Sequence, residues 1–308
     1  MAGRTTVWVR AGAAIAAVSV AAVGLVGWGG SAGAATATKY NYVALGDSYT
    51  SSTGFNAVPD VTYAPLGCFQ SQTDYPHQVA NILKTQGRLA SFADGSCGGA
   101  TTVDFTKAQK TTVGTNDPQF ARITKKTNLV TIGIGGNDAG LVSLATECVE
   151  DVLTFASCKA DNVKDGVDKE SAAINAAEPK IEAAIKGVRA RAAKGVRILL
   201  VNYLEAVPDN GKGCYPFIPL PASDMAWFTS KFKQLNAMLA TAAAKQKAQL
   251  VNTYTPTIGH NACASPTTRY VEFVGVLSLN PLLSLAAPLH PNIAGADAQT
   301  AIVASAIG

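Results

Sequence analysis

Charged residues and histidines are scarce in this sequence of 308 residues. Asp, Glu, Lys and Arg together make up 15% of it, there are three histidines, and no cluster of lysine and arginine stands out. A nucleic-acid-binding surface needs such a cluster, so we exclude nucleic acid as a partner. The zinc-binding motif Cys-x-x-Cys does not occur, and the small number of histidines argues against a zinc site. We expect neither a metal nor an organic cofactor.

Acidic residues are also absent before Asp47, and this stretch has the composition of a secretory signal peptide. Arg4 and Arg10 precede an Ala-, Val- and Gly-rich run over residues 11–29, and small-x-small sites follow at 32–34 and 35–37. We predict a signal peptide over residues 1–37, cleaved after about residue 34–37. A transmembrane anchor is the alternative, because the run is long enough to span a bilayer. The Ala- and Gly-rich composition favours cleavage.

The mature chain, residues 38–308, should carry little net charge. Removing Arg4 and Arg10 leaves 23 basic against 21 acidic residues, a net charge of +2. No later segment is apolar for long enough to cross a bilayer. We therefore expect a secreted, extracellular monomer with no stable membrane insertion.

All six cysteines lie beyond the predicted signal peptide, and an even number in an exported chain predicts three disulfides. Six cysteines allow fifteen pairings. The closest pair in sequence can clip a single loop, and the others would then pair in order. The expected disulfides are Cys148–Cys158, Cys68–Cys97 and Cys214–Cys263.

Strand-like and helix-like stretches alternate along the mature chain. Apolar strands separated by helices indicate a parallel sheet covered on both faces, so we predict one three-layer α/β/α domain. The expected strands are 42–45, 129–134, 196–201 and 249–253, and the expected helices are 75–86, 165–194, 228–247 and 294–306.

Three cysteine-containing stretches interrupt this pattern and are predicted to be long loops that border a site. They are residues 53–73, 147–163 and 214–223. The segment 215–221 is apolar for a loop. It either forms one wall of a hydrophobic substrate groove or packs under the disulfide of Cys214, and the sequence leaves both open.

Ser48 is the candidate nucleophile. A short apolar strand ends there in Gly-Asp-Ser, and open α/β sheets place their chemistry at the carboxyl ends of strands. The polar helix start at residues 49–54 offers amide groups to an oxyanion. The alternative is a helix-capping serine. A Gly-x-Ser-x-Gly elbow is absent, which disfavours a standard α/β-hydrolase.

Asn137 is the candidate donor to an oxyanion. It follows a strand and a glycine turn at residues 132–136, where the backbone can approach a ligand closely while the amide donates to developing negative charge. The turn lacks the Gly-x-Gly-x-x-Gly spacing of a dinucleotide site. The alternative role for Asn137 is that of a turn residue, and Asp138 is interpreted as structural.

His290 is the best candidate for a general base because it lies just before a helix start. His77 is interpreted as a surface or structural residue, and His260 lies in a loop beside a predicted disulfide. A base needs a group that orients its other ring nitrogen, usually a carboxylate. No acidic residue occurs between Glu272 and Asp297, so that group is not a carboxylate just upstream of His290.

Together, these segments resemble the SGNH (GDSL-type) hydrolases, and specifically the secreted actinobacterial lipases and esterases of that family. Gly46–Ser48 resembles the nucleophile block, Cys97–Thr102 the second block, Gly135–Asp138 the third and His290–Asn292 the last. The resemblance spans essentially the whole mature chain and implies a flavodoxin-like fold. It also implies a nucleophile, Ser48, a base, His290, and an oxyanion hole made by Ser48, Gly99 and Asn137.

Two positions depart from the family pattern. The family commonly has Asp three residues before the catalytic His, where this chain has Ala287, and Gly98 replaces the serine of a Ser-Gly-Ala second block. Some relatives are described as using a Ser–His dyad in which a main-chain carbonyl accepts from the imidazole. By this resemblance, the carbonyl of Ala287 or Pro288 would orient His290.

The residues and the resemblance predict a secreted serine hydrolase of carboxylic esters, a lipase or esterase. Low charge and apolar loop material favour a small-molecule or lipid ester over a charged substrate. The resemblance leaves phospholipase A1 and carbohydrate acetylesterase activities as alternatives. A different class, a secreted binding protein whose site has decayed, also stays open, with Ala287 as the visible sign of loss.

Overall fold

The computed structural model describes residues 38–51, 58–154, 156–215, 218, 220–272 and 289–308. The predicted signal peptide and the carbonyls of Ala287 and Pro288 lie outside the described residues, as do residues 216, 217 and 219 of the apolar segment 215–221. Within the described part of the chain, no helix is long and apolar enough to cross a membrane.

Five parallel strands form the central sheet, in the order β2-β1-β5-β8-β9. Their bounds are β1 Tyr40–Gly46, β2 Leu89–Asp94, β5 Leu129–Gly133, β8 Arg197–Val201 and β9 Gln249–Val251. In the register of β1 and β5, Gly46 pairs with Gly133, so both strands end at the same level. Their carboxyl ends therefore bring the Gly-Asp-Ser turn and the Gly-Gly-Asn turn together.

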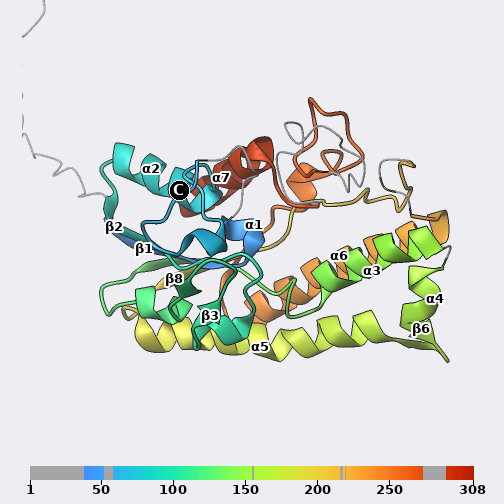
Figure 1. Ribbon diagram of the computed structural model, residues 1–308. Coiled ribbons are helices and arrows are strands. Elements are labelled where there is room, and N and C mark those ends of the chain that lie inside the picture. The colour runs from blue at the N-terminus through green and yellow to red at the C-terminus, as the bar shows by residue number, and fades with distance from the viewer. Residues whose placement is uncertain (1–37, 52–57, 155, 216–217, 219, 273–288) are drawn as a thin grey trace, which may run out of the picture. The chain divides into compact units, whose positions relative to one another are not determined.

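Helices cover both faces of this sheet, which confirms the predicted three-layer fold (Figure 1). One face carries α2, Tyr75–Thr85, and α7, Ile293–Ile307, which pack on each other. The other carries α5, Lys169–Arg191, and α6, Ala222–Lys245. Successive residues of a strand point to opposite faces, so Val43 and Leu45 belong to one apolar core and Tyr42 and Ala44 to the other.

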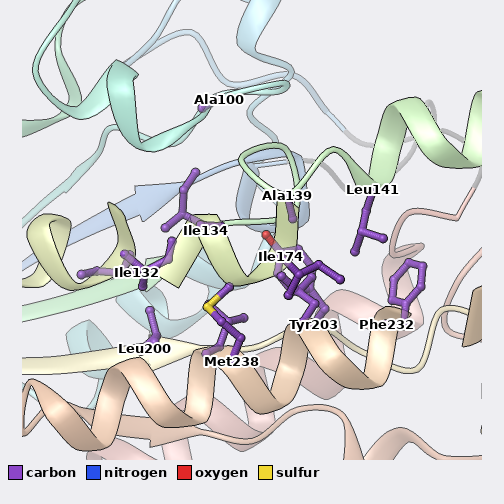
Figure 2. Close-up of a cluster of buried hydrophobic side chains, with 14 of the residues drawn as sticks. Ala100, Ile132, Ile134, Ala139, Leu141, Ile174, Leu200, Tyr203, Phe232 and Met238 are labelled. Carbon is purple, nitrogen blue, oxygen red and sulfur yellow. The ribbon is translucent and has the colours of Figure 1, made fainter. Parts of the chain in front are cut away.

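The core on the α5 and α6 side is shown in Figure 2. Ile132 of β5, Leu200 of β8, Ile174 of α5 and Met238 of α6 all belong to this buried cluster. Every residue of β5 is buried, which explains why this strand reads as apolar almost throughout.

The remaining elements are α3, which has 14 residues, and several short helices and strands. The helices are α1 Ser48–Ser51, α3 Leu141–Thr154 and α4 Cys158–Asn162; the strands are β3 Gln109–Lys110, β4 Thr115–Asn116, β6 Val163–Lys164 and β7 Val167–Asp168. Single 3₁₀ turns occupy Leu66–Cys68, Thr102–Phe105, Gln119–Arg122 and Thr255–Thr257.

The predicted loop over residues 147–163 was wrong, because α3 and α4 fill most of it. Leu141, Leu144 and Cys148 are buried at helical spacing on one side of α3. The predicted start of the next helix at residue 165 was also wrong. Residues 163–168 form a β-hairpin, and Asp168 caps α5 by accepting a hydrogen bond from the Ser171 N–H.

Two further boundaries differ from the prediction. The helix expected from residue 228 begins at Ala222, directly after Pro221. The edge strand β2 was not predicted, because only its last residue is fully buried and its sequence, Leu-Ala-Ser-Phe-Ala-Asp, carries no continuous apolar run.

Three disulfides are present, and they join the pairs that the sequence predicted. Cys148–Cys158 links α3 to α4. Cys68–Cys97 links the 3₁₀ turn at residues 66–68 to the segment after β2, and Cys214–Cys263 links two loops.

Candidate active site

The Gly-Asp-Ser turn is held at the end of β1 by backbone contacts. The Asp47 N–H donates to the Gly133 carbonyl at 2.9 Å. The Gln119 side chain grips Gly46, accepting from its N–H at 2.8 Å and donating to its carbonyl at 2.9 Å. A Cβ on Gly46 would lie 2.5 Å from the Gly133 carbonyl oxygen, so only glycine fits. The turn therefore presents Ser48 as the first residue of α1.

Ser48 and His290 are hydrogen-bonded, although 242 residues separate them in sequence. The Ser48 Oγ lies 2.7 Å from the His290 Nε2. The backbone around His290 is fixed by an antiparallel pairing in which the Glu272 N–H donates to the His290 carbonyl and the Leu289 N–H to the Glu272 carbonyl. Asn292 then caps α7 by accepting from the Gly295 N–H at 2.9 Å. The backbone that carries the imidazole is thus fixed on both sides of His290.

Tyr49 adds a contact between α1, which begins at Ser48, and the segment that carries His290. Its hydroxyl donates to the Leu289 carbonyl, and its ring centroid lies 5.2 Å from that of His290. Leu289 itself has a φ of 59°, a left-handed conformation that is costly for a branched side chain. The hydrogen bond to Tyr49 helps to hold this turn in place.

The carboxylate nearest to His290 in sequence is occupied elsewhere. Glu272 pairs with Arg269 at 2.7 Å and accepts from the Asn292 amide at 2.9 Å. Glu272 therefore makes its ion pair with Arg269 and not with the His290 ring.

The second and third sequence blocks meet beside the nucleophile turn. The Cys97 N–H donates to the Gly46 carbonyl at 3.0 Å, which places Gly99 next to the end of β1. Gly99 has a φ of 74°, a conformation that favours glycine. One N–H of the Asn137 amide donates to the Ala100 carbonyl at 2.9 Å. A primary amide has two such donors, so the second remains available to a ligand.

The backbone donors near Ser48 are also available. In the described part of the chain, neither the Ser48 N–H nor the Gly99 N–H has a backbone or side-chain acceptor. Such unpaired N–H groups beside a nucleophile are the feature that an oxyanion hole requires.

Tyr203 was missed by the sequence analysis, and it joins two of the blocks. Its hydroxyl donates to the Asp47 Oδ2 at 2.5 Å and accepts from the Gly136 N–H at 2.7 Å. The other oxygen of Asp47 accepts from the Tyr49 N–H at 3.0 Å. Tyr203 lies just beyond the carboxyl end of β8, the sheet edge at which sites gather, and that position was the available signal.

Burial governs the ionisation of Asp47. Desolvation raises its pKa to about 7, against the opposing effect of the hydrogen bond from Tyr203. Burial likewise raises the pKa of Tyr203 well above its ordinary value, and the charge of Asp47 raises it further. The Asp47–Tyr203 pair is therefore a neutral or singly charged unit that braces the turn, and it does not contact His290 directly.

The other predicted residues take structural positions. Asp138 accepts from the Thr102 N–H at 2.9 Å and the Thr102 hydroxyl at 2.6 Å, which joins the third block to the second. His260 is stacked on Tyr270, with its Nδ1 2.6 Å from the Thr268 carbonyl. His77 lies at the start of α2 among carboxylates.

Two solved structures of Streptomyces lipolytic enzymes have this fold. An extracellular lipase from Streptomyces rimosus aligns with a TM-score of 0.62 at 23% identity, covering 88% of this chain and 100% of that chain. Phospholipase A1 from Streptomyces albidoflavus NA297 aligns with a TM-score of 0.66 at 23% identity, covering 86% of this chain and 98% of that chain.

Sequence comparison identifies the family. Lipase 2 of Streptomyces coelicolor is 34% identical over 261 residues, which cover 83% of this chain and 81% of that protein. Residues 44–298 match the GDSL-like Lipase/Acylhydrolase family. The chain therefore belongs to the GDSL-like lipase/acylhydrolase family and is an ester hydrolase.

Proposed function

We propose that residues 38–308 form a secreted serine hydrolase in which Ser48 and His290 carry the chemistry. The observation that carries this proposal is the 2.7 Å contact between the Ser48 Oγ and the His290 Nε2. At that distance His290 can take the proton as Ser48 attacks the ester carbonyl, and can later give it to the leaving alcohol. Water then attacks the acyl group on Ser48 and gives a proton to His290. His290 returns this proton to the Ser48 Oγ as the carboxylic acid leaves.

The oxyanion hole of the proposal consists of the Ser48 and Gly99 backbone N–H groups and the Asn137 side-chain amide. Their support is the position of the three blocks at the carboxyl ends of β1, β2 and β5. Each fixed donor of this kind is worth about 3 kcal/mol of transition-state stabilisation.

In this proposal a backbone carbonyl, that of Ala287 or Pro288, accepts from the second ring nitrogen of His290. The support is indirect: residues 273–288 contain no acidic side chain, and Glu272 is committed to Arg269. A carbonyl fixes the tautomer of the imidazole but stabilises the imidazolium less than a carboxylate does.

The proposed substrate is a lipid or fatty-acyl ester. Phe69 supports it: this aromatic side chain is 58% exposed, has a left-handed φ of 58° and follows a disulfide-bonded cysteine. A Cβ built on Gly98 would lie 3.3 Å from the Phe69 ring, so the ring stands against the oxyanion segment. An exposed apolar ring at that place suits an acyl chain.

Three alternatives remain under this proposal. The solved phospholipase A1 with the same fold keeps a phospholipid substrate open. A carbohydrate acetylesterase uses the same kind of site, and a decayed binding protein would keep the fold without turnover. Hydrolysis of acyl esters of graded chain length separates these possibilities.

We also propose that residues 1–37 are removed on export and that the mature protein is an extracellular monomer. The support is the signal-like composition of residues 1–37, the three disulfides, and a structural relative that is described as extracellular. The intact mass of the protein recovered from culture medium tests the cleavage, and its hydrodynamic size tests the monomer.

The function is tested with p-nitrophenyl esters from acetate to palmitate, comparing the wild type with Ser48→Ala. We expect turnover by the wild type and a loss of about 10⁴-fold or more in the variant. Ser265→Ala, which removes the hydroxyl of an exposed serine, serves as the matched control. Turnover retained in Ser48→Ala would contradict the proposal, and a wild type inactive on these esters and on phospholipids would support the decayed binding protein.

A further inference from the structure

A second cluster of ionisable side chains lies away from Ser48, where the start of α2 meets the end of β2. Its centre is His77, whose Nδ1 lies 2.7 Å from the Asp74 Oδ1 and 3.9 Å from the Asp94 Oδ2. The Nε2 of the same ring lies 3.6 Å from the Asp60 Oδ2. Asp74 and Asp94 are almost completely buried, and the side chains of His77 and Asp60 are only 11% and 12% exposed.

Carboxylates outnumber positively charged groups in this cluster. Three carboxylates share one imidazole, and among the described residues no lysine or arginine lies within ion-pair distance of any of them. Burial raises the pKa of Asp94, and the charge of Asp74 raises it further. Burial lowers the pKa of His77, but its hydrogen bond with Asp74 and the surrounding carboxylates raise it overall, to about 9.

Unpaired polar atoms gather at the same place. The Asp94 Oδ2 and the His77 Nε2 are buried without a hydrogen-bond partner, as are the Gln70 Oε1 and the Ser96 Oγ. These residues touch one another, since the Gln70 amide donates to the carbonyls of Asp94 and Ser96. Buried polar atoms are seldom left unsatisfied, so several in one place indicate a missing ligand.

We propose that this cluster binds a divalent cation of the zinc type through His77, Asp74 and Asp94. The three ligand atoms lie within 4.8 Å of one another. Ligands of a tetrahedral zinc ion lie about 3.3 Å apart, between the observed 2.7 Å and 3.9 Å, so small side-chain shifts complete the site. Water supplies the fourth ligand.

The surroundings of the three ligands are those of a preorganised metal site. Binding replaces the proton between the His77 Nδ1 and Asp74, and the proton on Nε2 then faces Asp60, the carboxylate–histidine–metal arrangement. Each ligating carboxylate is also anchored by a backbone N–H. The Asp74 Oδ1 accepts from the His77 N–H at 3.0 Å, and the Asp94 Oδ1 from the Ser96 N–H at 2.8 Å.

The role of the cation is structural. It joins the start of α2 to Asp94, the last residue of β2, and Asp94 leads through the disulfide-bonded Cys97 into Gly99. A cation at this point therefore steadies the segment that carries a donor of the proposed oxyanion hole, without touching the reacting groups.

Zinc stoichiometry tests the proposal without reference to activity. The untagged mature protein is stripped with a chelator, dialysed against micromolar Zn²⁺ and analysed for bound metal. The chain has only three histidines, so His77→Gln, His260→Gln and His290→Gln form a complete set. We expect about one zinc per chain in the wild type and in the last two variants, and less than about a tenth of that in His77→Gln and in Asp94→Asn.

Three results would overturn the proposal: no zinc in the wild type, full binding in a folded His77→Gln variant, or a loss caused instead by His260→Gln or His290→Gln, which would mark adventitious binding. Asp60→Asn covers the case in which the buried variants do not fold, because Asp60 is at the edge of the cluster. It should keep the stoichiometry at high Zn²⁺ and weaken the affinity by about 10- to 100-fold. An unchanged affinity in that variant also counts against the proposal.

Discussion

His290 and His77 are placed in opposite surroundings, and the difference explains which of them can act as a base. The His290 Nε2 meets a serine hydroxyl, and the carboxylate nearest in sequence, Glu272, is paired with Arg269. His77 is surrounded by three carboxylates and meets no nucleophile. A neutral imidazole can accept a proton from serine, whereas a ring whose pKa is raised to about 9 already holds one at neutral pH.

The same comparison shows that the Asp-x-x-His spacing alone does not identify a catalytic Ser-His-Asp triad. The chain has a single Asp-x-x-His, at Asp74 and His77, and the two side chains are hydrogen-bonded at 2.7 Å as in a catalytic pair. The far side of that ring faces Asp60, not a serine. The histidine that does meet a serine has alanine at the corresponding position, Ala287. The contact with a serine hydroxyl, and not the Asp-x-x-His spacing, marks His290 as the candidate base.

The largest expected effect comes from replacing the base. His290→Ala should lower kcat/KM for a p-nitrophenyl ester by about 10⁴-fold, since it removes the group that activates Ser48. His260→Ala, which alters a histidine stacked on Tyr270, is the control and should change kcat/KM by less than about threefold. If His290→Ala and His260→Ala lowered kcat/KM equally, His290 would not be the base.

Asn137→Ala should have the next largest effect. Losing one oxyanion donor lowers kcat by about 10²- to 10³-fold and leaves KM nearly unchanged, because the interaction strengthens only in the transition state. Steady-state kinetics on a soluble ester separate the two constants. A change confined to KM would assign Asn137 to ground-state binding instead.

Asp47 provides a pH-dependent contrast with the histidines. Burial raises its pKa from 3.8 to about 7, so between these values the native state holds a proton that the unfolded state lacks. Its contribution is therefore most favourable below pH 4 and is lost as the pH rises through 7, by up to about 4 kcal/mol.

Urea unfolding of the wild type and Asp47→Asn at pH 5 and pH 8 measures this contribution. The variant has no carboxyl to ionise, so its stability relative to the wild type should increase between the two pH values. If the stability difference between Asp47→Asn and the wild type were equal at pH 5 and pH 8, Asp47 would have the same pKa in the folded and unfolded states.

The smallest expected effect is on acyl preference. Phe69→Ala should reduce kcat/KM for octanoate relative to acetate by about tenfold, because the exposed ring beside Gly98 would no longer contact the longer chain. The ratio of the two esters is the readout, since it cancels any loss of folded enzyme. An unchanged ratio would remove Phe69 from the substrate contacts.

Uniform burial made one strand of the sheet easy to predict from the sequence. β5 is buried at every residue and was found, whereas the edge strand β2 is mostly half-exposed and was missed. Helix α3 was not predicted because its apolar positions lie among polar residues and a cysteine, although their spacing is helical.

For the site, sequence motifs identified the residues at strand ends but not the side chains that hold them. Gln119 and Tyr203 come from distant segments and form hydrogen bonds with the Gly-Asp-Ser turn. No local sequence pattern predicts such long-range hydrogen bonds. The carboxylate cluster was missed for the same reason. Asp60, Asp74 and Asp94 are spread over three segments that only the fold brings together. The sequence argument against zinc counted histidines and took no account of carboxylate ligands.

The central claim is that Ser48 is activated by His290 and not by His77, the histidine that lies among three carboxylates. Labelling with a fluorophosphonate, followed by peptide mass spectrometry, tests it most directly. We predict close to one label per chain on Ser48 in the wild type and in His260→Ala, and labelling at least about 10³-fold slower in His290→Ala. A label on another residue, or a label on Ser48 that forms as fast without His290, would contradict the account.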